Sequence, residues 1–417
     1  MKRYTIIPTV LLSAACLQAH AMSSAPSQRA VVDHAAELAL AVYGDSLSSA
    51  QTLSGAIDAF LAAPSADSLT AAREAWIASR VPYQQTETFR FGNPWVDDWE
   101  GKVNAWPLDE GLIDYIAGDG ASDDNPYGGL NIIANANPTI GGQQIDASAI
   151  TPALLGDTLQ ELDGIESNVA TGYHAIEFLL WGQDLNGTQP GAGAREASDF
   201  ALDNCTNAPC DRRRDYLQAA TNLLLSDLQD AVDAWSDGGD ARAALTSLDD
   251  NAAVAALFTG MGSLAYGELA GERINLGLQL HDPEEEHDCF SDNTHASHYN
   301  DLVGIQNLYT GTYERIDGST LEGPSIADLV AASDERTAAL MTQRFEQANG
   351  AMLAMVDSAS TGNAFDVLIG EGNAEGNAVV RTVVESLVDL TRAIERSATR
   401  LGVSGMDTLD SDALSEF

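Results

Sequence analysis

Apolar residues recur at helical spacing over long parts of the chain, whereas the strict alternation that marks strands is scarce. The stretches that predict helices are 29–62, 68–90, 211–235, 251–280, 325–356 and 377–401. We expect the first helix to break near Gly44 and the second to be capped by Asp67 or Ser68. The Gly-, Asp- and Asn-rich connections between helices are 117–150, 183–198, 281–300, 315–324 and 359–376. Connections of this length tend to carry function.

This pattern predicts an all-α fold in which two antiparallel helical bundles of the four-helix type pack together. The length of 417 residues suits two domains of ordinary size. We place their boundary in the Asp237-Gly238-Gly239-Asp240 turn. The predicted units are a signal peptide (1–21), an N-terminal bundle (22–238) and a C-terminal bundle (239–417).

The N-terminus has the features of an export signal. Met1-Lys2-Arg3 is a short basic start, residues 4–17 are mostly apolar, and Ala19-His20-Ala21 fits a cleavage site. We therefore expect a location in the periplasm or at the outer membrane. A lipoprotein modified at Cys16 is less favoured, because Ser13 stands where a lipobox prefers Leu. No later segment approaches about 18 uninterrupted apolar residues, so no transmembrane helix is expected in the mature chain.

The composition is strongly acidic, with 62 Asp and Glu against 20 Lys and Arg and a net charge of −42. Nucleic acid phosphates and anionic membrane surfaces repel such a chain, so neither is expected as a partner. The simplest interpretation is a solvated acidic surface, as in a salt-tolerant organism whose medium screens self-repulsion.

Cysteine usage agrees with export. Cys205, Cys210 and Cys289 remain after the predicted cleavage. Cys205 and Cys210 flank a four-residue loop that contains proline, and this arrangement favours a local disulfide in an oxidising compartment. Cys289 is either a buried thiol or pairs with one of the other two.

The run with the clearest chemistry is Gly172-Tyr173-His174-Ala175-Ile176-Glu177-Phe178-Leu179-Leu180-Trp181-Gly182-Gln183-Asp184. His174 and Glu177 are three residues apart, so on a helix they share one face. An imidazole and a carboxylate placed in this way can share one metal ion in a bundle core. From spacing alone, a hydrogen bond between the two inside a packed bundle is the simpler alternative. Two ligands are also too few for a zinc site.

This GxHxxE run, continued by Phe-Leu-Leu-Trp-Gly-Gln-Asp, resembles the imelysin family, and within it the branch called iron-regulated protein A. Three further blocks also resemble the family. Together with the GxHxxE run they span most of the mature chain, in the order expected for the family. They are AWIASRVPYQQTETFRF at 75–91, NAWPLDE at 104–110 with IDY at 113–115, and EEEHDCFSDNTH at 284–295.

The resemblance implies two helical bundles that arose by duplication, in an exported bacterial protein associated with iron uptake. It also implies that the HxxE pair, His174 and Glu177, is the metal-binding element. The favoured function is therefore binding of iron, free or chelated, with envelope iron-transport proteins as candidate partners. The alternative is a zinc metallopeptidase, since the family is also classed among peptidases. A third interpretation is an interaction module in which the pair serves packing alone.

Several residues of the block at 75–91 are candidates for the same site. Glu87 and Arg80 are seven residues apart and share a helix face with Tyr83 and Arg90. Glu87 is a candidate metal ligand, and Arg80 a candidate to orient a carboxylate or bind an anionic chelator. An ion pair within the bundle is an equally favoured interpretation of these two charges.

Asp109 follows a Trp-Pro turn and is a candidate oxygen ligand. Trp106 beside it and Trp181 after the motif are candidate binding contacts. The segment 284–298 gathers acids with His287, His295 and His298. It is either a second metal patch or, as we favour, a loop held by local hydrogen bonds. In the resulting hypothesis the first bundle supplies the ligands, and the second bundle and the loop 281–300 close the cleft.

Overall fold

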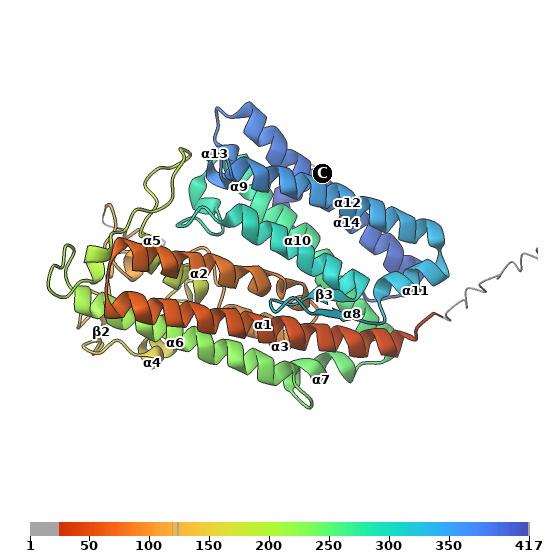
Figure 1. Cartoon of the computed structure of the whole chain (residues 1–417), viewed down its shortest axis with the longest axis horizontal. Helices are drawn as coiled ribbons and strands as arrows, with labels where there is room; N and C mark the ends of the chain where they lie inside the picture. The colour runs from red at the N-terminus through yellow and green to blue at the C-terminus, as the bar shows by residue number, and fades with distance from the viewer. Residues whose placement is uncertain (1–24, 119, 123–124, 416–417) are drawn as a thin grey trace, which may run out of the picture.

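The computed structural model describes residues 25–118, 120–122 and 125–415, which form a mostly helical protein. Long helices lie in two bundles, and the chain completes the first before it enters the second (Figure 1). The all-α prediction is therefore confirmed. The predicted signal peptide, including Cys16, lies outside the described residues.

The first bundle is built on α1 (Gln28–Ala62), which packs along α2 (Ala66–Gln84) and α6 (Cys210–Trp235). Between α2 and α6 packs α5 (Gly172–Trp181), the helix that carries the GxHxxE run. The shorter elements of this half are η1 (Glu87–Phe89), α3 (Pro94–Glu100), η2 (Glu110–Leu112), α4 (Pro152–Leu154), η3 (Leu155–Leu159), η4 (Leu162–Gly164), η5 (Ala197–Phe200) and α7 (Asp240–Thr246).

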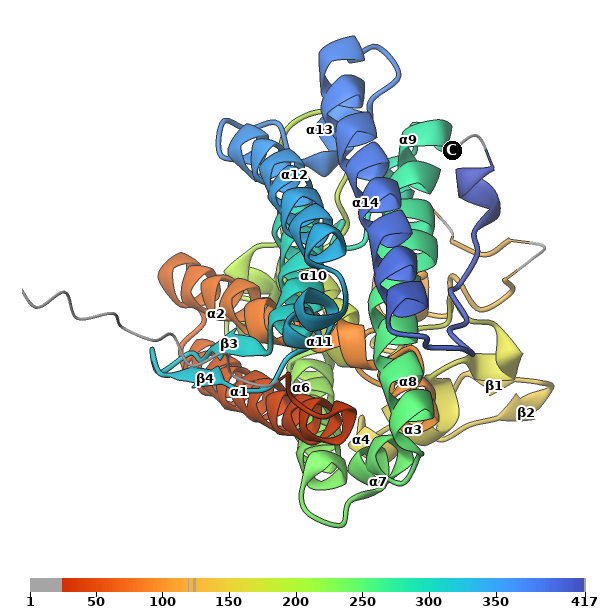
Figure 2. The same ribbon diagram turned by 90° about the vertical axis from the view of Figure 1, so that its right-hand side faces the viewer.

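The second bundle contains one continuous helix made of α8 (Asp250–Ser263), the π-helical η6 (Leu264–Asn275) and α9 (Leu276–Leu280). Figure 2 shows this helix beside α14 (Ala374–Arg400), which packs along α12 (Glu335–Ala359) on its other side. α10 (Thr294–Thr310) packs on α12 and on η6. The shorter elements are η7 (Pro283–Glu285), α11 (Ile326–Ser333), α13 (Phe365–Ile369) and η8 (Asp412–Leu414).

The strands of the described residues form two short antiparallel hairpins. In the first, β1 (Thr139–Ile140) pairs with β2 (Gln143–Gln144). In the second, β3 (Thr312–Glu314) pairs with β4 (Thr320–Glu322), and Tyr313 stands opposite Leu321. Tyr313 is buried, and its hydroxyl donates to Asp45 of α1 at 2.9 Å. The second hairpin therefore helps to join the two halves of the molecule.

Several predicted boundaries were wrong. α1 runs without a break through Gly44, because buried residues on both sides of it continue one packed face and outweigh the roughly 1 kcal/mol propensity cost of glycine. The cap of α2 is Ser65, whose hydroxyl accepts from the backbone of Ser68. α2 ends at Gln84, two residues after Pro82, rather than continuing to residue 90.

The second half also departs from the prediction in two places. The stretch 325–356 divides at Asp334, whose side chain caps α12. α10 begins at Thr294, inside a segment that the sequence assigned to a connection. In addition, α7 packs on α1, α3 and α6, so these residues of the predicted second unit lie with the first bundle.

One helix of the described residues, Asp250–Leu280, is long and apolar enough to cross a membrane by length and composition alone. In the structure 72% of its most apolar window is buried, much of it against α14. Core helices of soluble proteins pass the same test, so the finding is weak evidence for a membrane span.

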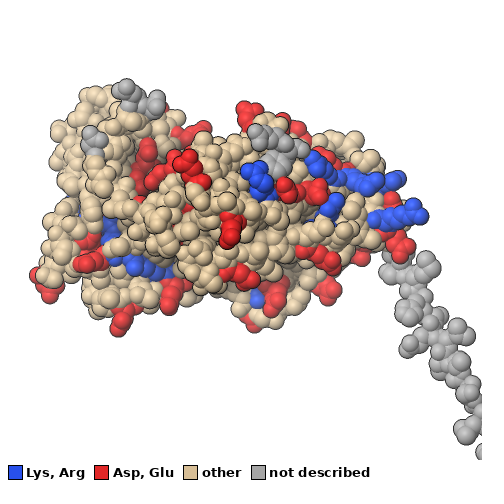
Figure 3. Space-filling model, turned by 90° about the horizontal axis from the view of Figure 1, so that it is seen from above, with Lys and Arg blue, Asp and Glu red and all other residues tan. Residues whose placement is uncertain are grey.

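The bundles meet closely where α10 packs on α2 and η1. A Cβ placed on Gly304 of α10 would lie 2.7 Å from the carbonyl oxygen of Gln85, so glycine is needed for this approach. Many acidic side chains of the chain lie on the outside, and Figure 3 shows them spread over the face seen from above. The buried polar groups near the bundle interface therefore stand out as exceptions.

Candidate metal centre

α5 places the predicted pair deep inside the protein, and all ten of its residues are buried. Gly172 begins the helix with a φ of +77°, and a Cβ at this position would overlap the backbone of Val103. The first residue of the GxHxxE run is therefore required as glycine to seat the helix. The apolar side chains of α5 fix the helix in the core and hold His174 and Glu177 in place.

His174 and Glu177 face one another as the spacing predicts. Nδ1 of His174 lies 3.0 Å from Oε2 of Glu177, and both side chains are buried. The other carboxylate oxygen, Oε1, accepts from the backbone N–H and the hydroxyl of Ser291, at 3.0 and 2.6 Å. Nε2 of His174 has no hydrogen-bond partner. One ring nitrogen is thus held by a carboxylate while the other is free to bind a ligand.

His287 and Asp288, from the segment between α9 and α10, complete the cluster. The ring centroids of His174 and His287 are 4.7 Å apart, with the planes nearly perpendicular. One ligand atom from each of His174, His287 and Asp288 lies within 4.8 Å of the other two, and all three residues are buried. Two imidazoles and a carboxylate from distant parts of the chain therefore converge on one point.

Asp288 is held by hydrogen bonds on both oxygens. Oδ1 accepts from Nη2 of Arg80 at 3.0 Å, and Oδ2 accepts from Nδ2 of Asn293 at 3.0 Å and from the hydroxyl of Ser297. The other arm of the Arg80 guanidinium donates to Oδ1 of Asn104 at 2.7 Å. Arg80 therefore orients a carboxylate of the cluster, which is one of the two roles proposed for it from the sequence.

His298 lies beside this cluster and is fully buried. Its ring centroid is 6.0 Å from that of His287, and neither ring nitrogen has a hydrogen-bond partner. Unpaired imidazole nitrogens in a protein interior are uncommon, because burying a polar atom without a partner costs free energy. His298 is therefore a further candidate to serve this site.

The imidazoles of the cluster are neutral at physiological pH. Burial and the nearby Arg80 charge lower the pKa of His174 to about 3. Burial and Arg273 lower the pKa of His298 to about 3, and the same two causes hold the pKa of His287 well below its usual value. A neutral imidazole offers a lone pair, so these rings are in the state that binds a metal.

The two carboxyl groups behave differently. Burial, reinforced by the charge of Asp288, raises the pKa of Glu177 well above its usual value. Burial alone would raise the pKa of Asp288 too, but Arg80 and the hydrogen bond from His287 outweigh it and hold that pKa well below its usual value. Asp288 is therefore a carboxylate at neutral pH, and a cation nearby would favour the same state in Glu177.

The residues present fit a metal ion. Nε2 of His174 is buried without a hydrogen-bond partner, which points to a missing electron-pair acceptor. One ligand atom from each of His174, His287 and Asp288 lies within 4.8 Å of the other two. Imidazole and carboxylate ligands suit iron, zinc and manganese. His174, His287 and Asp288 would hold the ion, and Glu177 and Arg80 would orient the ligands.

A cavity of about 190 Å³ lies next to this cluster. Its lining contains His174 and His287 together with Trp106, Pro107, Leu108, Asp109, Glu110, Glu284, Cys289 and Phe290. The indole N–H of Trp106 donates to the backbone oxygen of Glu286 at 3.1 Å, which fixes the ring beside His287. Asp109 accepts from Ser167 at 2.9 Å and from Asn125. Trp106 and Asp109 therefore line the space next to the cluster.

The structure places Glu87 and Arg90 in a different cluster. Glu87 is buried and accepts from Nη2 of Arg273 at 2.7 Å, in an ion-pair network that also includes Glu268 and Asp301. Arg90 pairs with acids of the same region and with Asp97 at 3.0 Å. Glu87 is thus engaged by an arginine and is not among the donors gathered around His174.

Tyr83 and Trp181 pack in the core next to the site. The ring of Tyr83 lies 4.8 Å from that of Tyr173, and the Arg80 guanidinium stands 5.4 Å from the centroid of the Tyr83 ring. Trp181 packs edge-on against Trp76 at the C-terminal end of α5. Trp181 is absent from the cavity lining, so its contacts are with the protein core.

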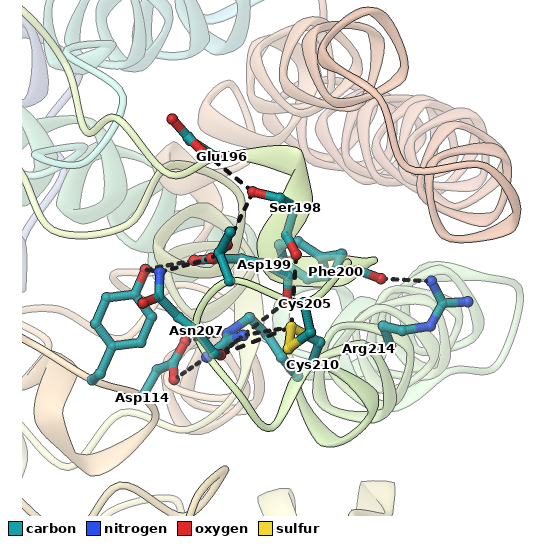
Figure 4. The surroundings of a disulfide bond; sticks show 12 residues. Asp114, Glu196, Ser198, Asp199, Phe200, Cys205, Asn207, Cys210 and Arg214 are labelled. Carbon is teal, nitrogen blue, oxygen red and sulfur yellow. Dashed lines mark hydrogen bonds and ion pairs between the residues drawn. A yellow bond between two sulfur atoms is a disulfide. The ribbon is translucent and has the colours of Figure 1, made fainter. Parts of the chain in front are cut away.

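Cys205 and Cys210 form a disulfide at the start of α6, with sulfur atoms 2.03 Å apart (Figure 4). Cys289 is a free thiol, and burial raises its pKa well above the usual value. The disulfide lies beside the buried pair of Arg213 and Asp114, which are joined at 2.6 Å. It closes a short loop away from the residues that surround His174.

The sequence missed the roles of His287, Asp288 and Ser291. The concentration of acids and histidines at 284–298 was the available signal, but the sequence gave more weight to local hydrogen bonds within that segment. Some of those bonds exist, such as the one from Asn293 to Asp288. The same segment nevertheless reaches α5, where Ser291 holds Glu177 and His287 packs on His174.

Comparisons with known proteins give the family. The imelysin model, a peptidase family, matches residues 39–394. Iron-regulated protein A of Synechococcus elongatus is 22% identical over 401 residues, which are 94% of this chain and 90% of that protein.

Solved structures show the same fold. A putative iron-regulated protein A precursor from Parabacteroides distasonis has a TM-score of 0.65 and 19% identity, over 91% of this chain and 97% of the other. An imelysin-like protein from Psychrobacter arcticum has a TM-score of 0.58 and 16% identity with the same coverage. The match of the family model over most of the sequence, in a chain with this fold, shows that the protein belongs to the imelysin family.

Proposed function

We propose that this protein binds iron at the cluster of His174, Glu177, His287 and Asp288 and carries it as cargo in bacterial iron uptake. The observation that supports this best is the convergence of three buried ligand atoms, one from each of His174, His287 and Asp288, within 4.8 Å. A packing role for the pair would leave no reason for Nε2 of His174 to be buried without a partner.

The donor set and the relatives favour iron over other metals as the cargo. Nitrogen and carboxylate oxygen donors suit iron in both common oxidation states. The relatives from Synechococcus and Parabacteroides carry the name iron-regulated protein A. The cavity of about 190 Å³ beside His174 and His287 has room for water or for part of a small chelator. Iron is therefore proposed to enter free or chelated from the side of Trp106 and Asp109.

The chain's own residues prepare the site before the ion arrives. Ser291 holds one oxygen of Glu177, and Glu177 in turn fixes the ring of His174 through Nδ1. Arg80 fixes Asp288. Such outer hydrogen bonds set the orientation and basicity of ligands, so little rearrangement is needed on binding. Export to the periplasm or outer membrane, and transfer to envelope iron-transport proteins, belong to the same proposal.

Metal titration of the purified protein tests the proposal. The wild type and the His174→Ala and Glu177→Gln variants are titrated with iron in competition with a coloured chelator. His281→Ala is the matched control, because His281 is half-buried and hydrogen-bonded to the backbone of Ile369. We expect one iron per chain in the wild type and in the control, and a loss of affinity of more than about tenfold in both site variants. Equal affinity in all four proteins would contradict the proposal.

A zinc metallopeptidase is the second candidate, because the family model is that of a peptidase family and the cavity adjoins His174. Histidine and carboxylate ligands also suit zinc. The cavity is small beside the roughly 300–1,000 Å³ of typical ligand sites, which favours a small ligand over an extended peptide. If the zinc-loaded wild type cleaved unstructured peptides and the Glu177→Gln variant did not, the result would favour the peptidase over the iron-binding protein.

A further inference from the structure

A second group of acidic side chains includes Asp292, the residue that follows Ser291. Asp184 comes from the loop after α5, Asp292 from the turn before α10, and Asp366 from α13. One carboxylate oxygen of each lies within 4.8 Å of the other two. The loop after α5 rises from the first bundle towards α13 in Figure 1, and Thr188 of that loop lies against Gly370 just after α13.

Asp366 is the unusual member of this acidic triad. Its side chain is 0% exposed, and neither carboxylate oxygen makes a hydrogen bond of good geometry. The backbone N–H groups of Asp366 and Val367, at the start of α13, are the polar groups that act on it besides the other acids. Oδ1 of Asp292 is also buried without a partner. In contrast, Oδ1 of Asp184 accepts from the backbone and the side-chain amide of Asn186, at 2.9 and 2.7 Å. A fully buried, unpartnered carboxylate that faces two others indicates a missing positive charge.

The described residues supply no cationic partner for this triad. Among the described residues, the ion pairs formed by Arg, Lys and His do not include Asp184, Asp292 or Asp366. The charged groups that act on Asp292 are the other two aspartates, and Asp292 and Asp366 both act on buried Glu286. Asp288, only four residues before Asp292, has Arg80 instead.

We propose that Asp184, Asp292 and Asp366 bind one hard divalent cation, with Ca²⁺ as the preferred ion. Ca²⁺ takes oxygen ligands at about 2.3–2.6 Å, so ligand oxygens up to about 5 Å apart can share its coordination sphere. The three carboxylates meet this limit, and water would fill the remaining positions. The triad contains no nitrogen or sulfur ligand, which separates its preference from that of the histidine cluster.

The position of the triad gives the cation a structural role. It would join the loop after α5, in the first bundle, to α13 in the second. It would also fix Asp292, whose neighbour Ser291 holds Glu177. A cation bound here would therefore brace the turn that carries His287 and Asp288, without touching the iron ligands. The proposal does not depend on which metal the histidine cluster takes.

Calorimetric titration with CaCl₂ tests this site in the mature protein after treatment with a chelator. We expect one Ca²⁺ per chain with a Kd of about 1 mM or tighter, the range that spans extracellular and sensor sites. Asp366→Asn and Asp292→Asn should each weaken binding at least tenfold. Asp237→Asn is the control for a lost acid, because its side chain is 100% exposed, and it should bind as the wild type does.

Two further measurements distinguish the triad from the histidine cluster and distinguish lost Ca²⁺ binding from a folding defect. His174→Ala should keep its Ca²⁺ affinity, and loss of Ca²⁺ binding in that variant would overturn the claim of a separate site. In chelator, Asp366→Asn should melt at or above the wild-type temperature, because it removes an uncompensated buried charge. Ca²⁺ should raise the Tm of the wild type and leave that of Asp366→Asn unchanged. Equal Ca²⁺ binding by wild type and Asp366→Asn would also overturn the proposal.

Discussion

Two clusters of buried polar side chains lie between the bundles, one around Arg273 and one around His174, and they obtain positive charge in different ways. In the first, the Arg273 guanidinium donates to Glu87 at 2.7 Å, to Glu268 at 2.9 Å and to Asp301 at 3.3 Å. In the second, Arg80 donates to Asp288 at 3.0 Å, while Nε2 of the neutral His174 ring is buried without a hydrogen-bond partner.

The difference separates a charge network that the chain completes itself from the cluster that we propose as a binding site. Arg273 is part of the chain, so the Arg273 cluster carries its counter-charge whenever the protein is folded. Removing that charge would leave carboxylates buried without compensation, which is strongly destabilising. In the His174 cluster, Arg80 pairs with Asp288 alone, and ring nitrogens of His174 and His298 stay unpaired. Under our proposals this cluster receives a cation from outside, and so does the acidic triad around Asp366, with oxygen ligands alone.

The largest expected effect comes from breaking the Arg273 cluster. Arg273→Met should lower the free energy of unfolding by about 3–5 kcal/mol, because Glu87 and Asp301 lose their buried partner. Urea unfolding measures the change. Arg344→Met is the matched control, since Arg344 forms a partly exposed pair with Asp389 at 2.8 Å and should cost no more than about 1 kcal/mol. Equal effects of the two substitutions would contradict the structural role of Arg273.

A smaller effect is expected from loosening the support of the His174 cluster. Ser291→Ala removes the hydroxyl that donates to Glu177 at 2.6 Å and leaves the backbone N–H in place. Iron affinity should fall about tenfold, the lower end of the range for outer-sphere changes, with the fold retained. Chelator competition measures the affinity. Ser358→Ala, which removes a half-buried hydroxyl of α12 that donates to the backbone of Ala354, should leave it unchanged. A loss as large as that of Ser291→Ala would remove the specific role of Ser291.

The smallest effect concerns pH. Burial raises the pKa of Asp292 to about 7 and that of Asp366 to about 6, against about 3.9 in an unfolded chain. The folded state therefore holds protons more tightly than the unfolded state. This contribution to stability is fully present below about pH 4 and is lost as pH rises from there through the folded values of about 6 and 7. In chelator, the free energy of unfolding of the wild type should fall by about 1 kcal/mol between pH 6 and 8, relative to Asp292→Asn.

Comparison with the variant is needed because other groups titrate nearby. Asp184, Asp366 and Glu286 face Asp292 from the neighbouring elements and remain in both proteins. The lowered pKa of His174 acts in the opposite sense, since it makes stability rise with pH, but only up to about 6.5. Addition of Ca²⁺ should abolish the difference in slope. If the free energy of unfolding in chelator varied with pH equally in the wild type and in Asp292→Asn, the pKa of Asp292 would not be raised by folding. That result would contradict the prediction.

Helical periodicity predicted α1, α6 and α14 well, because one face of each is apolar and packs in the core. It failed at α10, and the reason is physical. The first buried positions of α10 are polar: Thr294, Ser297, His298 and Asp301. These residues recur at helical spacing, but an apolar pattern does not reveal them. This stripe faces buried polar groups rather than an apolar core: Ser297 donates to Asp288, and Asp301 pairs with Arg273.

Local sequence patterns also predicted only part of the candidate site. His174 and Glu177 are neighbours on one helix, so their spacing alone predicted their contact. His287 and Asp288 lie more than a hundred residues later, and only the packing of the second bundle on α5 brings them to His174. Glu87 shares a block with Arg80 in the sequence, but its side chain turns to Arg273, which the sequence places far from it. Local spacing cannot distinguish these outcomes.

Anomalous diffraction from crystals of iron-loaded protein, measured on both sides of the iron edge, tests the central claim most directly. The account predicts one strong iron peak per chain within bonding distance of Nε2 of His174, His287 and Asp288, and no iron peak among the acids around Arg273. A main iron peak at the Arg273 cluster or on the acidic surface, with His174 still bonded only to Glu177, would contradict it.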